Sequence, residues 1–289
     1  MRLNNILKFS ALSILPVLLT ACDDVKPDDR YIDCGEIKVE RAVLLEDFTG
    51  QQCLNCPQAH KTIKELEAQY GEDKVIAVSI HCGEFGYSKT KTNFSKGNVG
   101  LMTEEGNAIL ETYGINSFPM GSINMGSPLT FPLWATAVRE ALSVASDVDI
   151  DLTVGYTPAS DNPDTGTINI SAGIMSGSAR TAEIQFWVIE DGIVAIQKDG
   201  NNYVYDYVHD GVFRGQVLSG VKGESIALAK GIEFNKEASI ETRWNEQEHW
   251  VPENLSIVAF VSDGSGVLQV TKVPVISKDD SGEAEEGKE

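Results

Sequence analysis

Two cysteines separated by two residues form the pattern in this chain with the clearest chemistry, Cys53-Leu54-Asn55-Cys56. At this spacing both sulfur atoms can lie in the first turn of a helix, where free backbone amides and the helix dipole favour a thiolate and lower the thiol pKa. The more exposed thiolate can attack a disulfide, and its partner can resolve the mixed disulfide that forms. A pair that only closes a stable disulfide has the same spacing, so the pattern alone leaves both roles open.

The residues around this pair predict a strand, a turn and a helix. β-Forming residues fill 41–48, Thr49-Gly50 ends that run, and apolar residues then recur at helical spacing through 59–70. Pro57 suits a first helical turn, where a missing amide costs least. Residues 75–80 are almost all apolar, as in a parallel strand buried on both faces. We therefore expect the cysteines at the start of the helix of a β-α-β unit.

Further landmarks resemble thioredoxin. Tyr113-Gly114-Ile115 precedes Pro119 at the spacing that thioredoxins show before their cis-proline, and Asp47 lies six positions before Cys53, as a thioredoxin acid does. The resemblance covers about residues 37–146 and implies a thioredoxin-like α/β domain. Within it, two more helices are predicted, at 107–113 and 133–142.

The resemblance also implies roles for individual residues. Cys53, at the exposed helix end, is the attacking thiolate and Cys56 the resolving thiol. Asp47, buried beneath them, has a raised pKa and exchanges a proton with Cys56, and Pro119 presents its backbone to the substrate chain. The implied activity is thiol–disulfide exchange with thiols or disulfides of exported proteins, and we expect no cofactor.

Two features depart from thioredoxin. Gln52 stands before the first cysteine, where many thioredoxins have Trp, so the docking surface differs. A long segment, 83–105, follows the strand that ends near the cysteines. A loop of this length is usually functional or disordered, so a lid, a partner-binding loop and a mobile insertion all fit.

Two other functions remain open. Cys53, Cys56 and His60 form a Cys-x2-Cys-x3-His set that could bind copper or zinc, although a polar residue on a helix face is the commoner role for such a histidine. Otherwise the pair is a structural disulfide in a non-catalytic surface binding module. Tyr203, Tyr205 and Tyr207 share one strand face that could contact a glycan or protein, although packing is the commoner role of such a stripe.

The N-terminal residues predict export and a lipid anchor. Residues 1–21 combine basic residues with an apolar stretch too short to span a bilayer, as in a signal peptide. They lead into Leu19-Thr20-Ala21-Cys22, which resembles a bacterial lipoprotein signal in which Cys22 becomes lipid-modified. Residues 22–36 read as a flexible acidic tether. The acids just after Cys22 resemble the surface-export signal of Bacteroidetes lipoproteins, so an outer-membrane location is expected.

The other two cysteines are Cys34 and Cys82. In an exported protein they can form a second disulfide that ties the tether to the domain. Alternatively, Cys82 at the end of a strand can relay electrons to the Cys53–Cys56 pair. The sequence leaves both arrangements open.

From Val148 onward the apolar period changes to two, which indicates β-strands. Residues 147–277 therefore predict an all-β immunoglobulin-like sandwich. Besides strands at 148–156 and 168–174, we expect strands at 182–189, 203–208, 225–229, 238–244, 255–261 and 267–273. The last residues, 278–289, hold six acids, two bases and no large apolar residue, so we expect a disordered tail.

The layout as a whole resembles a Bacteroidetes outer-membrane lipoprotein family. That family joins a lipid anchor, a thioredoxin-like domain with Thr-Gly-x-x-Cys-x-Asn-Cys-Pro-x-Ala, which residues 49–59 match here, and a C-terminal β-domain. The chain has 43 acidic and 23 basic residues and a net charge of −20. Nucleic acid is therefore not an expected partner, because phosphate binding relies on clustered Lys and Arg. The sequence does not indicate an oligomeric state.

Overall fold

The computed structural model describes residues 36–277 apart from 97, 161 and 163–164. The predicted signal peptide, the predicted lipidation site Cys22, nearly all of the tether and the acidic tail lie outside the described residues, and so does Cys34. The described residues belong to one compact unit. No helix among them is both long enough and apolar enough to cross a membrane.

The first half of the chain contains the predicted β-α-β unit. β1 (Val43–Thr49) and β2 (Val75–His81) pair in parallel, and α1 (Cys56–Tyr70) connects them. Every residue of β1 and β2 is buried, as expected of strands covered on both faces. β3 (Met120–Ile123) pairs antiparallel with β1, and the short β4 (Leu129–Thr130) pairs with β3.

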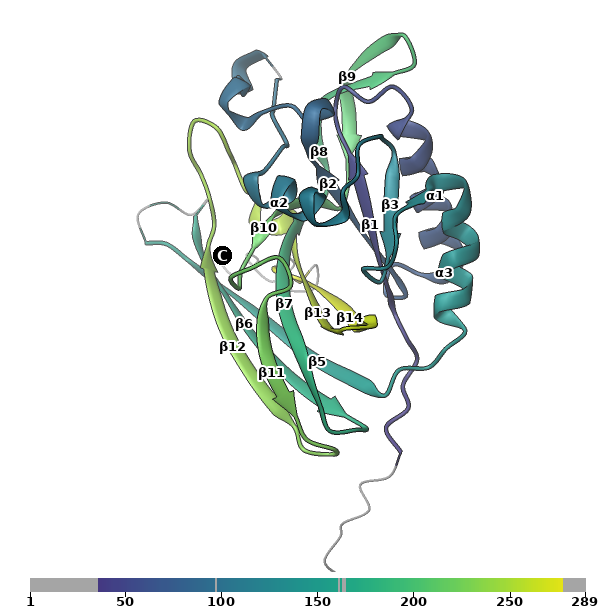
Figure 1. The fold of residues 1–289 in the computed structure, drawn as a ribbon. Helices are drawn as coiled ribbons and strands as arrows, with labels where there is room; N and C mark the ends of the chain where they lie inside the picture. The colour runs from purple at the N-terminus through teal and green to yellow at the C-terminus, as the bar shows by residue number, and fades with distance from the viewer. Residues whose placement is uncertain (1–35, 97, 161, 163–164, 278–289) are drawn as a thin grey trace, which may run out of the picture. The chain divides into compact units, whose positions relative to one another are not determined.

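Two more helices complete this half, α2 (Glu104–Tyr113) and α3 (Trp134–Leu142), which confirm the helices predicted there. Figure 1 shows α1 and α3 together on one side of β1 and β3. There Trp134 of α3 and Ile63 of α1 belong to one buried apolar cluster. Ile109 of α2 belongs to a different cluster, so α2 does not share the core of the other two helices.

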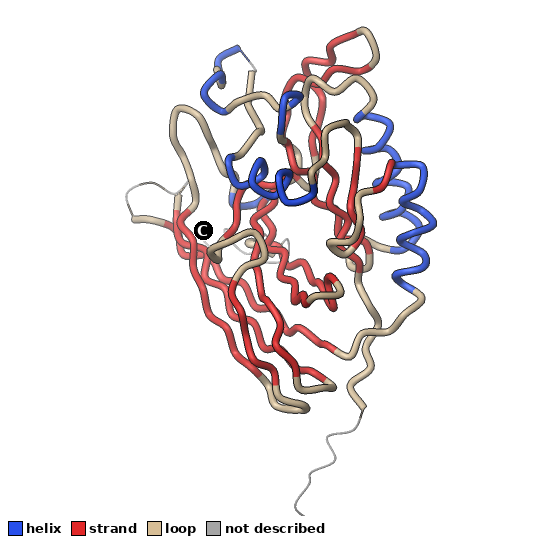
Figure 2. The backbone as a smooth tube through the Cα atoms, viewed as in Figure 1, coloured by secondary structure: helices blue, strands red, loops and turns tan. Residues whose placement is uncertain are grey.

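The second half consists of β-strands (Figure 2). Three of them form an antiparallel sheet in which buried residues alternate with more exposed ones, as the period of two predicts: β5 (Val148–Pro158), β6 (Gly166–Ser176) and β12 (Phe234–Glu241). Four more belong to a second sheet: β7 (Arg180–Glu190), β11 (Glu224–Leu228), β13 (Leu255–Asp263) and β14 (Gly266–Pro274). Side chains of both sheets, such as Ile170 of β6 and Phe186 of β7, form one apolar core.

One nine-stranded sheet runs through both halves of the chain. Its order is β14-β13-β7-β10-β2-β1-β3-β4, with β11 beside β7. β10 (Val212–Gln216) is the junction, because it pairs antiparallel with β7 while its Val212 pairs in parallel with Ser79 of β2. An apolar cluster also crosses between the halves and includes Ile80 of β2 and Trp187 of β7. The two halves predicted on either side of 146/147 therefore share a sheet and an apolar cluster.

A separate two-stranded hairpin precedes β10. It consists of β8 (Ile193–Asp199) and β9 (Asn202–His209) and belongs to neither larger sheet. β9 matches the strand predicted at 203–208, whereas β8 and β10 were not predicted. This hairpin reaches the cysteine pair, as described next.

Candidate functional site

The cysteine pair lies where the sequence predicts it, at the start of α1. Cys53 and Cys56 form a disulfide with their Cα atoms 5.5 Å apart, and Cys56 is the first residue of the helix. Pro57 occupies the first turn. The backbone amide of Cys53 donates a hydrogen bond to the carbonyl of Gly50, which closes the turn between β1 and the pair.

The expectation that Cys53 lies at an exposed helix end is wrong. Cys53 is only 3 % exposed and Cys56 is fully buried. The cause is the β8–β9 hairpin, whose Lys198 amide donates to the Gln51 carbonyl at 2.8 Å and whose Gly200 amide donates to the Leu54 carbonyl at 3.0 Å. We call this hairpin the cover.

A buried glutamine of the cover contacts the cysteine turn directly. The Gln197 side-chain amide donates to the carbonyl of Cys53 at 3.0 Å and to that of Gly50 at 3.3 Å. On the turn itself, Gln51 is buried, and its side chain donates to the carbonyl of Ile196 in the cover at 3.1 Å. The sequence did not indicate a role for either glutamine. Local patterns cannot show that Gln197, far along the chain, folds back onto the turn and contacts it.

The long segment after β2 packs against the same turn. The Gln52 amide donates to the Phe85 carbonyl at 3.0 Å, and the Leu101 amide donates to the side chain of Gln51 at 3.1 Å. The segment also binds the second half of the chain, since Lys89 pairs with Glu248 at 2.7 Å. Its described residues are therefore held by contacts with the cysteine turn and with the second half of the chain.

Gly50 of the turn packs closely against this segment. A Cβ atom at Gly50 would lie 2.4 Å from the backbone carbonyl group of Phe85. We expect Gly50→Ala to lower the free energy of unfolding by about 1–3 kcal/mol, because the backbone on one side must shift. It should also speed reduction of the Cys53–Cys56 disulfide by dithiothreitol. Urea unfolding and reduction kinetics measure the two effects.

The matched control is Gly155→Ala in β5, where an added Cβ meets nothing within 4 Å. This variant should leave the reduction rate unchanged. Equal behaviour of the two variants would contradict the close packing inferred at Gly50.

Asp47 is fully buried, as predicted, and its neighbour is His60 of α1. The Asp47 carboxylate lies 3.3 Å from Nε2 of His60, which also lies 3.0 Å from the Thr49 hydroxyl. The other ring nitrogen, Nδ1, lies 2.8 Å from the hydroxyl of Tyr207 on β9. The sequence places His60 on a helix face near Cys56, but nothing in it indicates these three partners.

Three of the four histidines of the chain gather at this point. The His209 ring centre lies 5.1 Å from that of His81 and 6.4 Å from that of His60. Burial, with the neighbouring His60, lowers the pKa of His209 to about 3. Burial likewise holds the pKa of His81 well below its ordinary value, and the other two histidines add to the effect. Both rings are therefore neutral at neutral pH.

The geometry does not favour the alternative metal set. Both sulfur atoms of Cys53 and Cys56 are joined in the disulfide, and both nitrogens of His60 face other side chains. Within the described ranges, no group of three or more His, Cys, Asp and Glu side chains is arranged to hold a metal ion.

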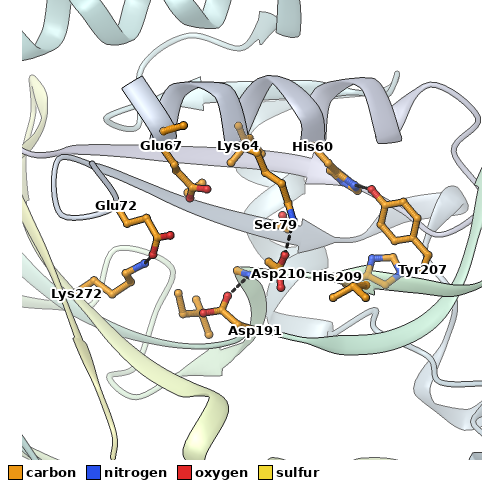
Figure 3. Close-up of a pocket in the computed structure, with 16 residues that line it drawn as sticks. His60, Lys64, Glu67, Glu72, Ser79, Asp191, Tyr207, His209, Asp210 and Lys272 are labelled. Carbon is orange, nitrogen blue, oxygen red and sulfur yellow. Dashed lines mark hydrogen bonds and ion pairs between the residues drawn. The ribbon is translucent and has the colours of Figure 1, made fainter. Parts of the chain in front are cut away.

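A cleft of about 500 Å³ opens beside the histidines. His60 and Tyr207 line it, and Figure 3 shows their side chains pointing toward one another from α1 and β9. Two ion pairs also line it, Lys64–Asp210 at 2.8 Å and Lys272–Glu72 at 3.5 Å. The other two tyrosines of the predicted stripe are exposed, Tyr203 by 48 % and Tyr205 by 72 %. The three tyrosines therefore do not share one environment: Tyr207 lines the cleft, and Tyr203 and Tyr205 lie at the surface.

The remaining predicted residues among those described are Pro119 and Cys82. Pro119 follows a cis peptide bond and comes immediately before β3. Cys82, directly after β2, is a buried free thiol that donates to the carbonyl of Ile80 at 3.2 Å, and burial raises its pKa. Because Cys34 lies outside the described residues, its pairing with Cys82 stays a prediction.

The chain is built mostly of β-sheet, and the comparison with known protein families identifies it as an outer-membrane protein. It belongs to the family described as outer membrane protein Omp28, whose family model matches residues 106–279, more than half of the chain. The family places the protein in the outer membrane, as predicted.

One solved structure adds a likeness of fold. The chain is similar to HBP35 of Porphyromonas gingivalis, with a TM-score of 0.60 and 16 % identity over 82 % of this chain and 76 % of that one. A domain of the outer membrane lipoprotein Omp28 from Porphyromonas gingivalis shares 21 % identity, over 45 % of this chain and 88 % of that domain, with a TM-score of 0.31. No curated protein matches this chain.

Proposed function

We propose that this protein carries out thiol–disulfide exchange with exported proteins through Cys53 and Cys56. The observation that carries the proposal is the disulfide in the first turn of α1, directly after a strand with the fully buried Asp47. β1 to β4 with α1 and α3 support a thioredoxin-like arrangement of this half, and the two packed sheets support an immunoglobulin-like sandwich in the other.

Energetics favour a chemical role over a purely structural one. A disulfide that closes so short a ring restricts the unfolded chain little and contributes roughly 2 kcal/mol in the loop-entropy relation. Neither carboxylate oxygen of Asp47 makes a hydrogen bond with the described residues. Burying such a group is costly, and its one partner in ion-pair range among the described residues is His60. An acid that accepts a proton from Cys56 explains its presence.

The reaction needs only the pair and a substrate. With the pair reduced, the Cys53 thiolate attacks a substrate disulfide, one substrate sulfur leaves as a thiolate, and a mixed disulfide forms. Cys56 then loses its proton and attacks the Cys53 sulfur, which releases the second substrate thiolate and restores the Cys53–Cys56 disulfide. The cover must move aside for a substrate to reach Cys53.

Trapping tests the proposal. Cys56→Ser should accumulate mixed disulfides with partner proteins, because attack survives and resolution is lost. Cys53→Ser should form none and should lose nearly all catalysis of insulin reduction by dithiothreitol. Both are measured on non-reducing gels and by the turbidity of reduced insulin. Cys82→Ser, which removes a buried thiol outside the pair, is the control and should exchange like the wild type.

The burial of Cys53 favours a second candidate, a structural disulfide in a non-catalytic surface binding module. The same experiment separates the two. If Cys53→Ser and Cys56→Ser both match the wild type in exchange and differ only in stability, the binding module is the better description.

A further inference from the structure

We infer that His60 and Tyr207 form the path along which the proton released by Cys56 leaves the buried site. The inference rests on the proposed exchange reaction. It addresses a problem that the fold creates, because Asp47 is fully buried and cannot exchange a proton with water directly. His60 is its only ionisable neighbour in ion-pair range among the described residues.

The three groups stand in a row. Asp47 on β1 faces Nε2 of His60 at 3.3 Å, and Nδ1 on the opposite side of the ring faces the Tyr207 hydroxyl at 2.8 Å. The His60 side chain is 13 % exposed, between the buried acid and the partly exposed tyrosine. His60 and Tyr207 both line the cleft of about 500 Å³, so the row ends at space that water can fill (Figure 3).

Two arrangements of the hydrogens fit these contacts. In the structure Nε2 is hydrogen-bonded to the Thr49 hydroxyl, and Asp47 lies 3.3 Å from it without a hydrogen bond. With a proton on Asp47, a small movement of the acid lets it donate to Nε2, while Nδ1–H donates to the Tyr207 oxygen. With Asp47 ionised, Nε2–H faces the carboxylate, and the Tyr207 hydroxyl donates to Nδ1. Moving one proton along each contact converts the first arrangement into the second and passes one proton to water in the cleft. The proton that Cys56 gives to Asp47 thereby leaves the interior, and Asp47 returns to its ionised form.

The groups around the row suit a relay. His81 of β2 and His209 of β9 face His60, and burial keeps both rings neutral, so neither competes for the proton at neutral pH. Burial raises the pKa of Tyr207 to about 12, and the charges of Asp47, Asp199 and Asp210 contribute. Tyr207 therefore stays a neutral hydroxyl that can accept one proton and donate another.

A two-phase reaction tests the path. The reduced protein is mixed with dithiobis(nitrobenzoic acid), so that the first coloured thiolate reports attack by Cys53 and the second reports resolution by Cys56. His60→Ala should slow the second phase about tenfold or more near neutral pH, at the lower end of general acid–base effects. It should leave the first phase nearly unchanged. Added imidazole should restore much of the second phase in His60→Ala.

Tyr207→Phe removes one hydroxyl and should slow the second phase severalfold. Its matched control is Tyr205→Phe on the same strand face, where the side chain is 72 % exposed and should have no effect. His60→Gln keeps a polar side chain if His60→Ala folds poorly, and circular dichroism checks each fold. A loss of activity through structural damage alone would not be rescued by imidazole.

The outcomes separate the two claims. If the wild type shows both phases but His60→Ala and Tyr207→Phe resolve at the wild-type rate, the proton path is wrong and the proposed exchange stands. If the wild type releases no more of the second thiolate than Cys56→Ser does, the exchange itself is wrong and the path falls with it.

Discussion

Arg214→Met is expected to lower the free energy of unfolding by about 3–5 kcal/mol. Arg214 of β10 is almost fully buried and lies 3.1 Å from Glu190 and 3.5 Å from Glu248, which are buried too. Removing the guanidinium leaves two carboxylates in the interior with less compensating charge. The midpoint and slope of urea unfolding measure the change.

Lys64→Met is the matched control, because it breaks an ion pair of similar length whose members are 62 % and 39 % exposed. An exposed pair contributes little, so the loss should stay below about 1 kcal/mol. Arg214→Lys should recover only part of the stability, since a single ammonium group cannot bridge both carboxylates as the guanidinium fork does. Equal losses in Arg214→Met and Lys64→Met would show that the buried network does not depend on Arg214.

His209→Phe is expected to reduce the loss of stability in acid. The folded-state pKa of His209, about 3, lies below its ordinary value of 6.5. The unfolded chain therefore binds a proton at pH 5 that the folded protein does not, and stability falls as the pH drops below 6.5. At pH 5 this single group costs about 2 kcal/mol relative to pH 7. Phenylalanine keeps a ring in the cluster and cannot take up a proton.

The test compares two proteins, because other groups shift stability in the opposite direction. Burial raises the pKa of Glu46 and of Glu67 to about 7, so the folded state gains stability at those sites as the pH falls from 7 toward 4.5. Both carboxyls are present in wild type and variant, and their effect cancels in the difference. His81→Phe should act with the same sign. Identical acid profiles for wild type and both variants would contradict the neutral buried cluster.

The sequence predicts well those elements whose apolar residues follow one period. α1, the continuous β2 and the alternating β5 are all present as expected. β8 and β10 escaped prediction because each carries a buried polar residue, Gln197 and Arg214, within a short run. Local patterns could not show that such residues find partners elsewhere in the fold.

The features of the candidate site also fall into two groups, those that local sequence predicts and those that depend on distant segments. The helix-start disulfide, the buried Asp47 and the cis peptide bond before Pro119 follow from local spacing and from the resemblance to thioredoxin. The burial of Cys53 and the contact between His60 and Tyr207 depend on a hairpin more than 140 residues away along the chain. Such long-range contacts do not change the spacing of apolar residues in either segment, so the sequence pattern does not reveal them.

The strand junction at β10 limits how the protein can be divided. The first half meets β10 at one residue pair, Val212 with Ser79, supported by a hydrogen bond from the Ser79 amide to the Gly211 carbonyl. A recombinant fragment that stops before β7 would present that side of β2 as a bare, largely apolar edge. Such edges recruit strands from other molecules, so the fragment would aggregate, and the cysteine pair is best studied within the intact chain.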